Sequence, residues 1–119
     1  MIVERTDFVS VFTRDIPRAK QFYGETLGLE LESEGESDLE FSCGQVTLDV
    51  FEPTSIGQEF APSPAGLALR VNDVDEVRAE LEAKGVEFDG ETLETAVCKM
   101  AFFKDPDGNA LLLHRRYDV

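Results

Sequence analysis

The sequence is short of basic residues, and that shortage limits its partners. Lys and Arg number 11 against 25 Asp and Glu, and the formal net charge is −14. So acidic a surface repels phosphate backbones and anionic membranes, and we therefore expect neither nucleic acid nor a membrane as a partner. The acids are spread along the whole chain, which favours a solvation shell, as in a high-salt cytoplasm, over a local preference for cationic ligands.

Residues that bind metals or form disulfides are also scarce. The two cysteines, Cys43 and Cys98, lie too far apart for metal-ligand spacing, and His114 is the only histidine. We interpret both thiols as small buried hydrophobes of a reduced, cytoplasmic protein. The opening MIVERTD carries acids where a secretory signal would need an apolar run, and no stretch approaches membrane-spanning length.

An internal repeat organises the 119 residues, a length that suits one domain. The segments 8–31 and 66–88 share one layout at an offset of 58 positions: an alternating strand, an aspartate, an amphipathic helix, a glycine and a second strand. Asp15 and Asp73 are placed to cap the two helices. Apolar residues at helical spacing begin at Ile16 and Val74.

Strands follow each predicted helix. In the first half we expect them at 28–34, 38–43 and 46–52, and in the second at 86–90, 96–103 and 109–115. Each half is therefore a β-α-β-β-β module, about 1–52 and 66–119, and the proline-containing stretch 53–65 is a linker within one domain, 1–119. The DPDG stretch, 105–108, is a turn in which Gly108 takes a positive φ, a structural role that needs no chemistry.

Two motifs, RDIPRAKQFYGETLGLEL and FFKDPDGNALLL, together with the paired modules, closely resemble the vicinal oxygen chelate superfamily. That superfamily includes glyoxalase I, extradiol dioxygenases, and the bleomycin- and fosfomycin-resistance proteins. The resemblance implies an α+β fold in which two βαβββ modules form an eight-stranded curved mixed sheet with helices on the convex side. It also implies a homodimer. It does not fix the function, because this fold carries several chemistries and some binding proteins.

Enzymes of the superfamily usually hold a divalent metal with four side chains on the concave face. The matching positions here are Phe8, Asp49, Gly66 and Leu112. Three of these four cannot bind a metal, and one carboxylate cannot hold a catalytic ion alone. We therefore predict no metal and no other cofactor.

Alternation along the strands predicts what lines the concave face instead. The candidate ligand-binding residues are Phe8, Ser10, Phe12, Asp49, Phe51, Ala68, Arg70, Leu112 and His114. An apolar lining with a few polar groups is typical of a small-molecule pocket. The alternative is that these side chains fill the cleft as core or form a dimer interface. The face on which Cys98, Met100 and Phe102 lie stays open.

Asp49 and His114 allow several interpretations. Asp49 either forms an ion pair with Arg70 or orients a cationic or hydrogen-bonding ligand, and a general base with a raised pKa is a third hypothesis. His114 near a strand end is most simply a surface residue.

We therefore predict a metal-free binding protein that sequesters a small aromatic or amphipathic molecule, with no catalytic residues. The alternative is a metal-independent isomerase, lyase or cyclase that uses Asp49 with His114 or Arg70.

Overall fold

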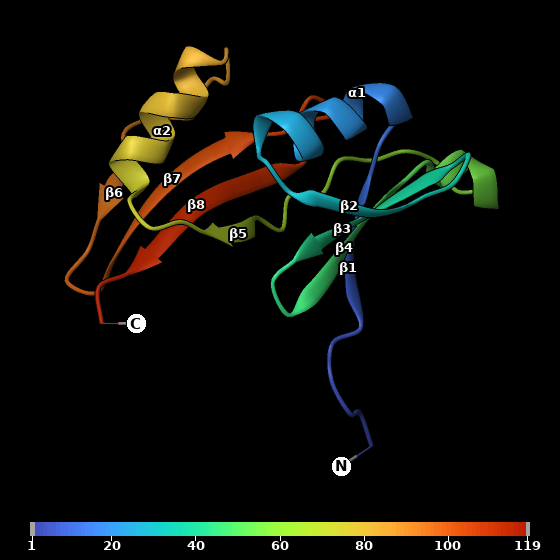
Figure 1. Ribbon diagram of the computed structural model, residues 1–119, viewed down its shortest axis with the longest axis horizontal. Coiled ribbons are helices and arrows are strands. Elements are labelled where there is room, and N and C mark those ends of the chain that lie inside the picture. The colour runs from blue at the N-terminus through green and yellow to red at the C-terminus, as the bar shows by residue number, and fades with distance from the viewer. Residues whose placement is uncertain (1, 119) are drawn as a thin grey trace. The chain divides into compact units, whose positions relative to one another are not determined.

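The computed structural model describes residues 2–118. Contacts divide the chain into two compact units, Met1–Pro62 and Ser63–Val119, each with its own sheet and helix (Figure 1). That the two units form a single domain stays a prediction.

The first unit is a four-stranded mixed sheet with a helix on one face. Its elements are β1 (Phe8–Phe12), α1 (Ile16–Lys20), η1 (Gln21–Thr26), β2 (Glu30–Glu34), β3 (Asp38–Cys43), β4 (Val46–Phe51) and a short 3₁₀ turn, η2 (Pro53–Ile56). The strand order is β1-β4-β3-β2, and β1 runs parallel to β4 while the other pairs are antiparallel. The helix α1 packs on β3 and β4.

The second unit repeats this topology. It contains β5 (Leu67–Arg70), α2 (Val74–Ala83), β6 (Leu93–Glu94), β7 (Cys98–Lys104) and β8 (Ala110–Arg116), in the order β5-β8-β7-β6. Asp15 and Asp73 both cap their helices, each carboxylate accepting from the backbone N–H three residues on at 3.0 Å. The α+β fold with two βαβββ modules is thus confirmed, and hydrogen bonds divide its eight strands into two sheets of four.

The helix side of each sheet forms the core. Fully buried side chains from the first sheet are Leu39, Phe41, Leu48 and Val50, and those from the second are Ala101, Phe103, Leu111 and Leu113. Helix residues Tyr23 in the first unit and Val74 and Leu81 in the second complete these cores. Of the two thiols, Cys98 is buried as expected, but Cys43 is only partly so.

One local expectation was wrong. The strand expected at 86–90 is reduced to a single bridge between Phe88 and Phe103, and the edge strand is β6 instead. The Phe88 and Phe103 rings pack in a tilted arrangement with centroids 5.0 Å apart, so side-chain packing rather than a strand ladder holds this segment. The first helix also widens after Lys20, where the N–H of Leu27 donates to the carbonyl of Phe22 five residues back.

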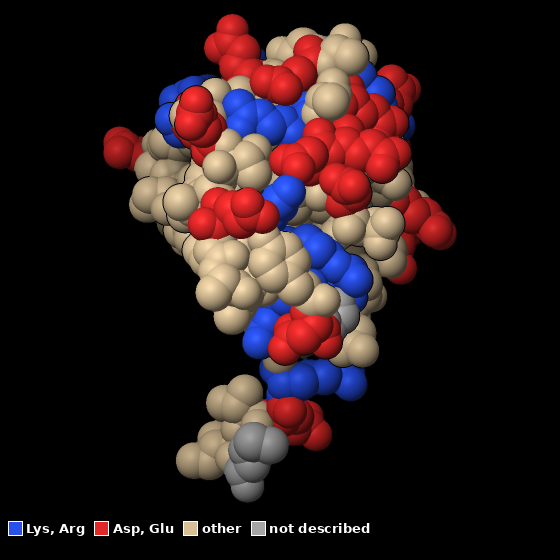
Figure 2. Space-filling view, turned by 90° about the vertical axis from the view of Figure 1, so that its left-hand side faces the viewer, with Lys and Arg blue, Asp and Glu red and all other residues tan. Residues whose placement is uncertain are grey.

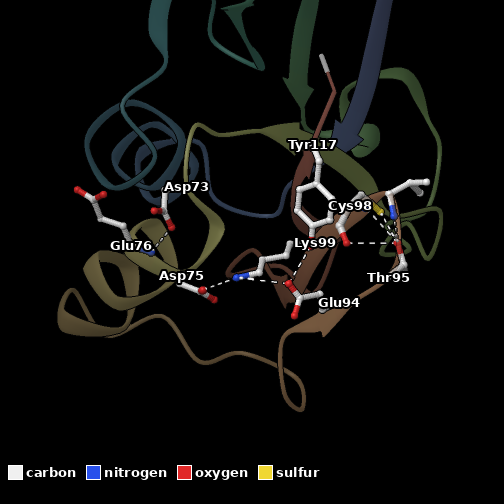
Figure 3. A network of polar contacts seen from close by, with 9 residues as sticks. Asp73, Asp75, Glu76, Glu94, Thr95, Cys98, Lys99 and Tyr117 are labelled. Atoms are coloured by element: carbon white, nitrogen blue, oxygen red, sulfur yellow. Dashed lines mark hydrogen bonds and ion pairs between the residues drawn. The ribbon is translucent and has the colours of Figure 1, made fainter.

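Polar contacts link α2 and β6 to Lys99 on β7 in the second unit (Figure 3). Lys99 of β7 lies 2.6 Å from the carboxylate of Asp75 on α2 and 3.8 Å from that of Glu94 on β6. The Tyr117 hydroxyl donates to Glu94 at 2.9 Å. Because these pairs are exposed, each contributes little to stability, and burial of Val74 and Leu81 holds α2 in place.

The surface charge is distributed rather than gathered. Figure 2 shows several groups of acidic side chains, most of them in the upper part of one face, with Lys, Arg and uncharged residues between them. No helix within residues 2–118 combines the length and apolar character that crossing a bilayer requires.

The 105–108 turn has the structural role predicted for it. Gly108 has a φ of 89°, and Asp105 is only 6% exposed. The Asp105 carboxylate accepts from the backbone N–H groups of Asp107 and Asn109 at 2.9 Å and from the Asn109 side-chain amide at 2.7 Å. Asn109 in turn accepts from the N–H of Ser63 at 2.8 Å, so the turn holds the start of the second unit.

We predict that Asp105→Ala lowers the free energy of unfolding by about 3 kcal/mol, because three donors lose a charged, buried acceptor. Urea denaturation followed by circular dichroism measures this. The control is Glu91→Ala, an exposed acid of the same unit, which should change stability by less than about 0.5 kcal/mol. Equal losses in the two variants would show that the turn is not held by Asp105.

Candidate ligand-binding site

An open pocket of about 570 Å³ lies on the sheet of the first unit. It is lined mainly by apolar surface, and its lining residues are Phe8, Ser10, Phe12, Ser37, Asp38, Asp49, Phe51, Ser55 and Ile56. Five of these are candidate residues from the sequence. They come from β1 and β4.

The alternation of β4 places the pocket on the sheet face away from α1. Leu48 and Val50 are fully buried on the helix side, so Asp49 and Phe51 project to the opposite face. The parallel register sets Ser10 beside Asp49 and Phe12 beside Phe51. The Ser10 hydroxyl donates to the Asp49 carbonyl at 3.3 Å, which fastens β1 to β4 at this level.

Aromatic rings form one side of the pocket. Phe12 and Phe51 meet edge to face, with ring centroids 5.0 Å apart and planes at 79°. Phe8 is 53% exposed, so its ring is available to a guest instead of being used as core. Ile56, on η2, is 66% exposed and adds an aliphatic wall.

Three carboxylates lie together on this face, and two of them, Asp38 and Asp49, line the pocket. Glu40 of β3 is the register partner of Asp49, and Asp38 precedes it by two residues on the same face. One oxygen from each of Asp38, Glu40 and Asp49 lies within 4.8 Å of the other two. The Oδ1 atom of Asp49 is shielded from solvent and has no hydrogen-bond partner among the described residues.

This crowding changes the protonation of Asp49. The pKa of the Asp49 carboxyl is raised from 3.8 to about 6, chiefly by burial and further by the charge of Asp38, a hydrogen bond with Asp38 and the charge of Glu40. The three acids share one face, and no cation among the described residues of the first unit compensates them. Asp49 therefore holds its proton up to mildly acidic pH.

The remaining four candidates lie on the second unit. In the parallel pairing of β5 with β8, Ala68 lies beside Leu112 and Arg70 beside His114. Ala68 and Arg70 are exposed, His114 is partly buried and Leu112 is only 9% exposed. The candidate residues thus form two groups, one on each sheet.

The register also assigns the face that the sequence left open. Met100 pairs with His114 and Phe102 with Leu112, so both belong to the sheet face that carries these candidates. Phe102 is 36% exposed.

Sequence reasoning missed four lining residues. Asp38 lay in a recognised strand, but its face depends on the pairing of β3 with β4. Ser37 precedes that strand, and Ser55 and Ile56 lie in the stretch taken as a linker. The only sequence signal for any of these four lining residues was that Ile56 is an apolar residue between Pro53 and Gly57.

The family's metal site does not fit these residues. Phe8 and Leu112 carry no donor atom, and Gly66 has a φ of 77°, a conformation that would strain a histidine. The only described group of three potential ligands is Asp38, Glu40 and Asp49, all carboxylates. No histidine or cysteine joins them there, and the group does not reproduce the family's ligand positions.

The chain is an α+β protein built from two βαβββ modules, each of which forms one four-stranded mixed sheet. The sheet of the first module carries an apolar pocket on its open face. Residues 5–113 match the model of the Glyoxalase/Bleomycin resistance protein/Dioxygenase superfamily, and the chain belongs to this family.

Individual relatives cover nearly the whole chain. The uncharacterized protein YetH of Bacillus subtilis (strain 168) is 26% identical over 118 residues, 94% of this chain and 98% of that protein. TnmS3, an antibiotic binding protein from Streptomyces sp. CB03234, is 30% identical with a TM-score of 0.80, covering 98% of both chains. A putative glyoxalase family protein from Bacillus anthracis is 25% identical with a TM-score of 0.81, again over 98% of both.

We predict that Asp49→Asn raises the thermal midpoint by a few degrees above pH about 6.5, and changes it little near pH about 4. The folded pKa lies above the unfolded value, so the stability contributed by Asp49 is complete at low pH and is lost as pH rises through 6. Because solvent reaches much of the side chain, we expect a gain of only about 1 kcal/mol.

Scanning calorimetry across this pH range measures the effect. The matched control is Glu59→Gln, which removes one exposed charge from the same unit outside the pocket lining. A pH-independent difference between Asp49→Asn and the unmodified chain would contradict the raised pKa.

Proposed function

We propose that this protein binds a small aromatic or amphipathic molecule in the pocket of the first unit and sequesters it without chemical change. The observation that carries the proposal is the pocket itself, an apolar hollow with partly exposed phenylalanines and few polar groups. Such a lining buries a flat guest, and ring–ring contacts add about 0.5–1.5 kcal/mol each.

The family supports a binding role of this kind. TnmS3, at 30% identity, is an antibiotic binding protein. Ala68, Arg70, Leu112 and His114, on the second sheet, stay candidate ligand-binding residues on this proposal.

A metal-independent enzyme is the second candidate, and one observation favours it. The pKa of Asp49 is raised to about 6, which suits a general base that works near neutral pH. The sequence names His114 or Arg70 as the second residue of such an enzyme, and that pairing stays a prediction. Recovery of the bound compound unchanged after prolonged incubation separates sequestration from turnover.

We also propose that the protein is a cytoplasmic homodimer. The outer strands β1 and β2 in the first sheet, and β5 and β6 in the second, are edges whose backbone groups pairing would satisfy. Neither nucleic acid nor a membrane is a partner on this proposal, because the net charge is −14.

Phe51→Ala should weaken binding of a neutral aromatic probe, naphthylmethanol, about tenfold, since it removes both ring contact and buried apolar area. Fluorescence titration measures the dissociation constant. Phe60→Ala is the control: it removes a ring of the same size from the same unit, where Phe60 stacks under Arg14 outside the pocket lining. Equal effects of the two substitutions, or no binding by the unmodified chain, would contradict the proposal.

Metal analysis of the purified protein should find less than stoichiometric divalent ion after dialysis, because Phe8, Gly66 and Leu112 supply no ligand. Inductively coupled plasma mass spectrometry measures the content. A stoichiometric ion that is lost in Asp49→Asn would overturn the metal-free assignment.

A further inference from the structure

We infer that the guest of this pocket is an organic cation, an aromatic molecule whose protonated amine is bound by Asp38, Glu40 and Asp49. This inference rests on the proposed function and specifies its ligand class.

The first argument is the charge of the lining. Asp38 and Asp49 line the pocket, Glu40 lies beside Asp49, and the other lining residues are Phe, Ser and Ile. Among the described residues of the first unit, no Lys or Arg side chain forms an ion pair with these three carboxylates. Within the pocket the field is therefore negative, and the low-polarity rings beside it reduce its screening.

The second argument is the geometry of the acceptors. One oxygen of each carboxylate lies within 4.8 Å of the others. At the largest such separation an atom equidistant from all three lies about 2.8 Å from each, which is the usual N–H···O length for an ammonium and a carboxylate. A primary ammonium carries three N–H donors, one for each oxygen.

The third argument is an unmet hydrogen bond. Asp49 shares a hydrogen bond with Asp38, yet its Oδ1 atom is shielded from solvent and has no partner among the described residues. A buried acceptor without a donor is costly, and a donor from the guest removes that cost. The neighbouring Ser10 hydroxyl does not supply it, because it donates to the Asp49 carbonyl.

The aromatic side of the pocket complements this cation site. Phe8, Phe12 and Phe51 lie on the same face as Asp49, so a ring and an ammonium group on one small molecule reach both. The face of a phenylalanine ring also attracts a cation.

Proton exchange should accompany binding. The titratable groups facing Asp49 are Asp38 and Glu40 on β3, while β1 contributes only Phe8, Ser10 and Phe12 on this face. In the free protein Asp49 keeps its proton below pH about 6. An ammonium favours the ionised form, so amine affinity should rise about tenfold from pH about 5 to pH about 6.5 and then level off.

The test uses three probes that share one ring: naphthylmethylamine, naphthylmethanol and naphthoate. Calorimetric titration near neutral pH should show the amine binding at least about tenfold tighter than the alcohol, and naphthoate weakest. Titrations in two buffers of different ionisation enthalpy, at pH about 5.5, should reveal proton release with the amine alone.

Variants assign the effect to the carboxylates. Glu40→Gln and Asp49→Asn should each weaken amine binding about tenfold and leave the alcohol within about twofold. Glu59→Gln, the same loss of charge outside the lining, should change neither. Circular dichroism verifies that each variant is folded, and Glu40→Gln carries the test should Asp49→Asn not fold.

The outcomes separate the two proposals. If the alcohol binds as tightly as the amine, the cation inference is wrong and the pocket remains a binding site. If none of the three probes binds, the proposed function fails, and the cation inference fails with it. If naphthoate binds best, the carboxylates do not set the ligand charge and the inference is overturned.

Discussion

The complete burial of Leu48 and Val50 under the first helix determines how the first unit is arranged. These two side chains fix which face of β4 meets the helix, and β4 lies between β1 and β3. Because neighbours in a strand alternate, Asp49 and Phe51 must then lie on the open face. A slip of one residue would bury Asp49 in the core, so packing on one face sets the chemistry of the other.

Asp49 is not explained by folding alone. A threonine there would suit a half-buried strand, whereas an acid beside Asp38 and Glu40 adds repulsion that raises its pKa to about 6. No described cation of the first unit offsets that repulsion. Strongly shifted groups of this kind gather at functional sites, where burial and like charges set the pKa of a working group. The ionised Asp49 on the open face therefore lowers the stability of the fold, whereas the side chains on the helix side do not.

Features set by local sequence were predictable, and features set by packing were not. The caps at Asp15 and Asp73 and the turn at Asp105 depend on residues close in sequence, and the structure confirms them. The shift of the last edge strand to β6 depends on Phe88 meeting Phe103, which no local pattern records. Likewise Glu40 faces Asp49 only through the register of β3 with β4, so alternation within one strand could not bring the three acids together.

A comparison of the two units shows which features the fold determines and which features the exposed residues determine. Both have the same strand order, and both pair their first strand in parallel with their last. At equivalent pairs the first unit carries Ser10 with Asp49, and the second carries Ala68 with Leu112. The helix side is apolar in both, whereas the open faces differ in charge. Substitutions on the open face can therefore change its chemistry, while the buried face preserves the architecture.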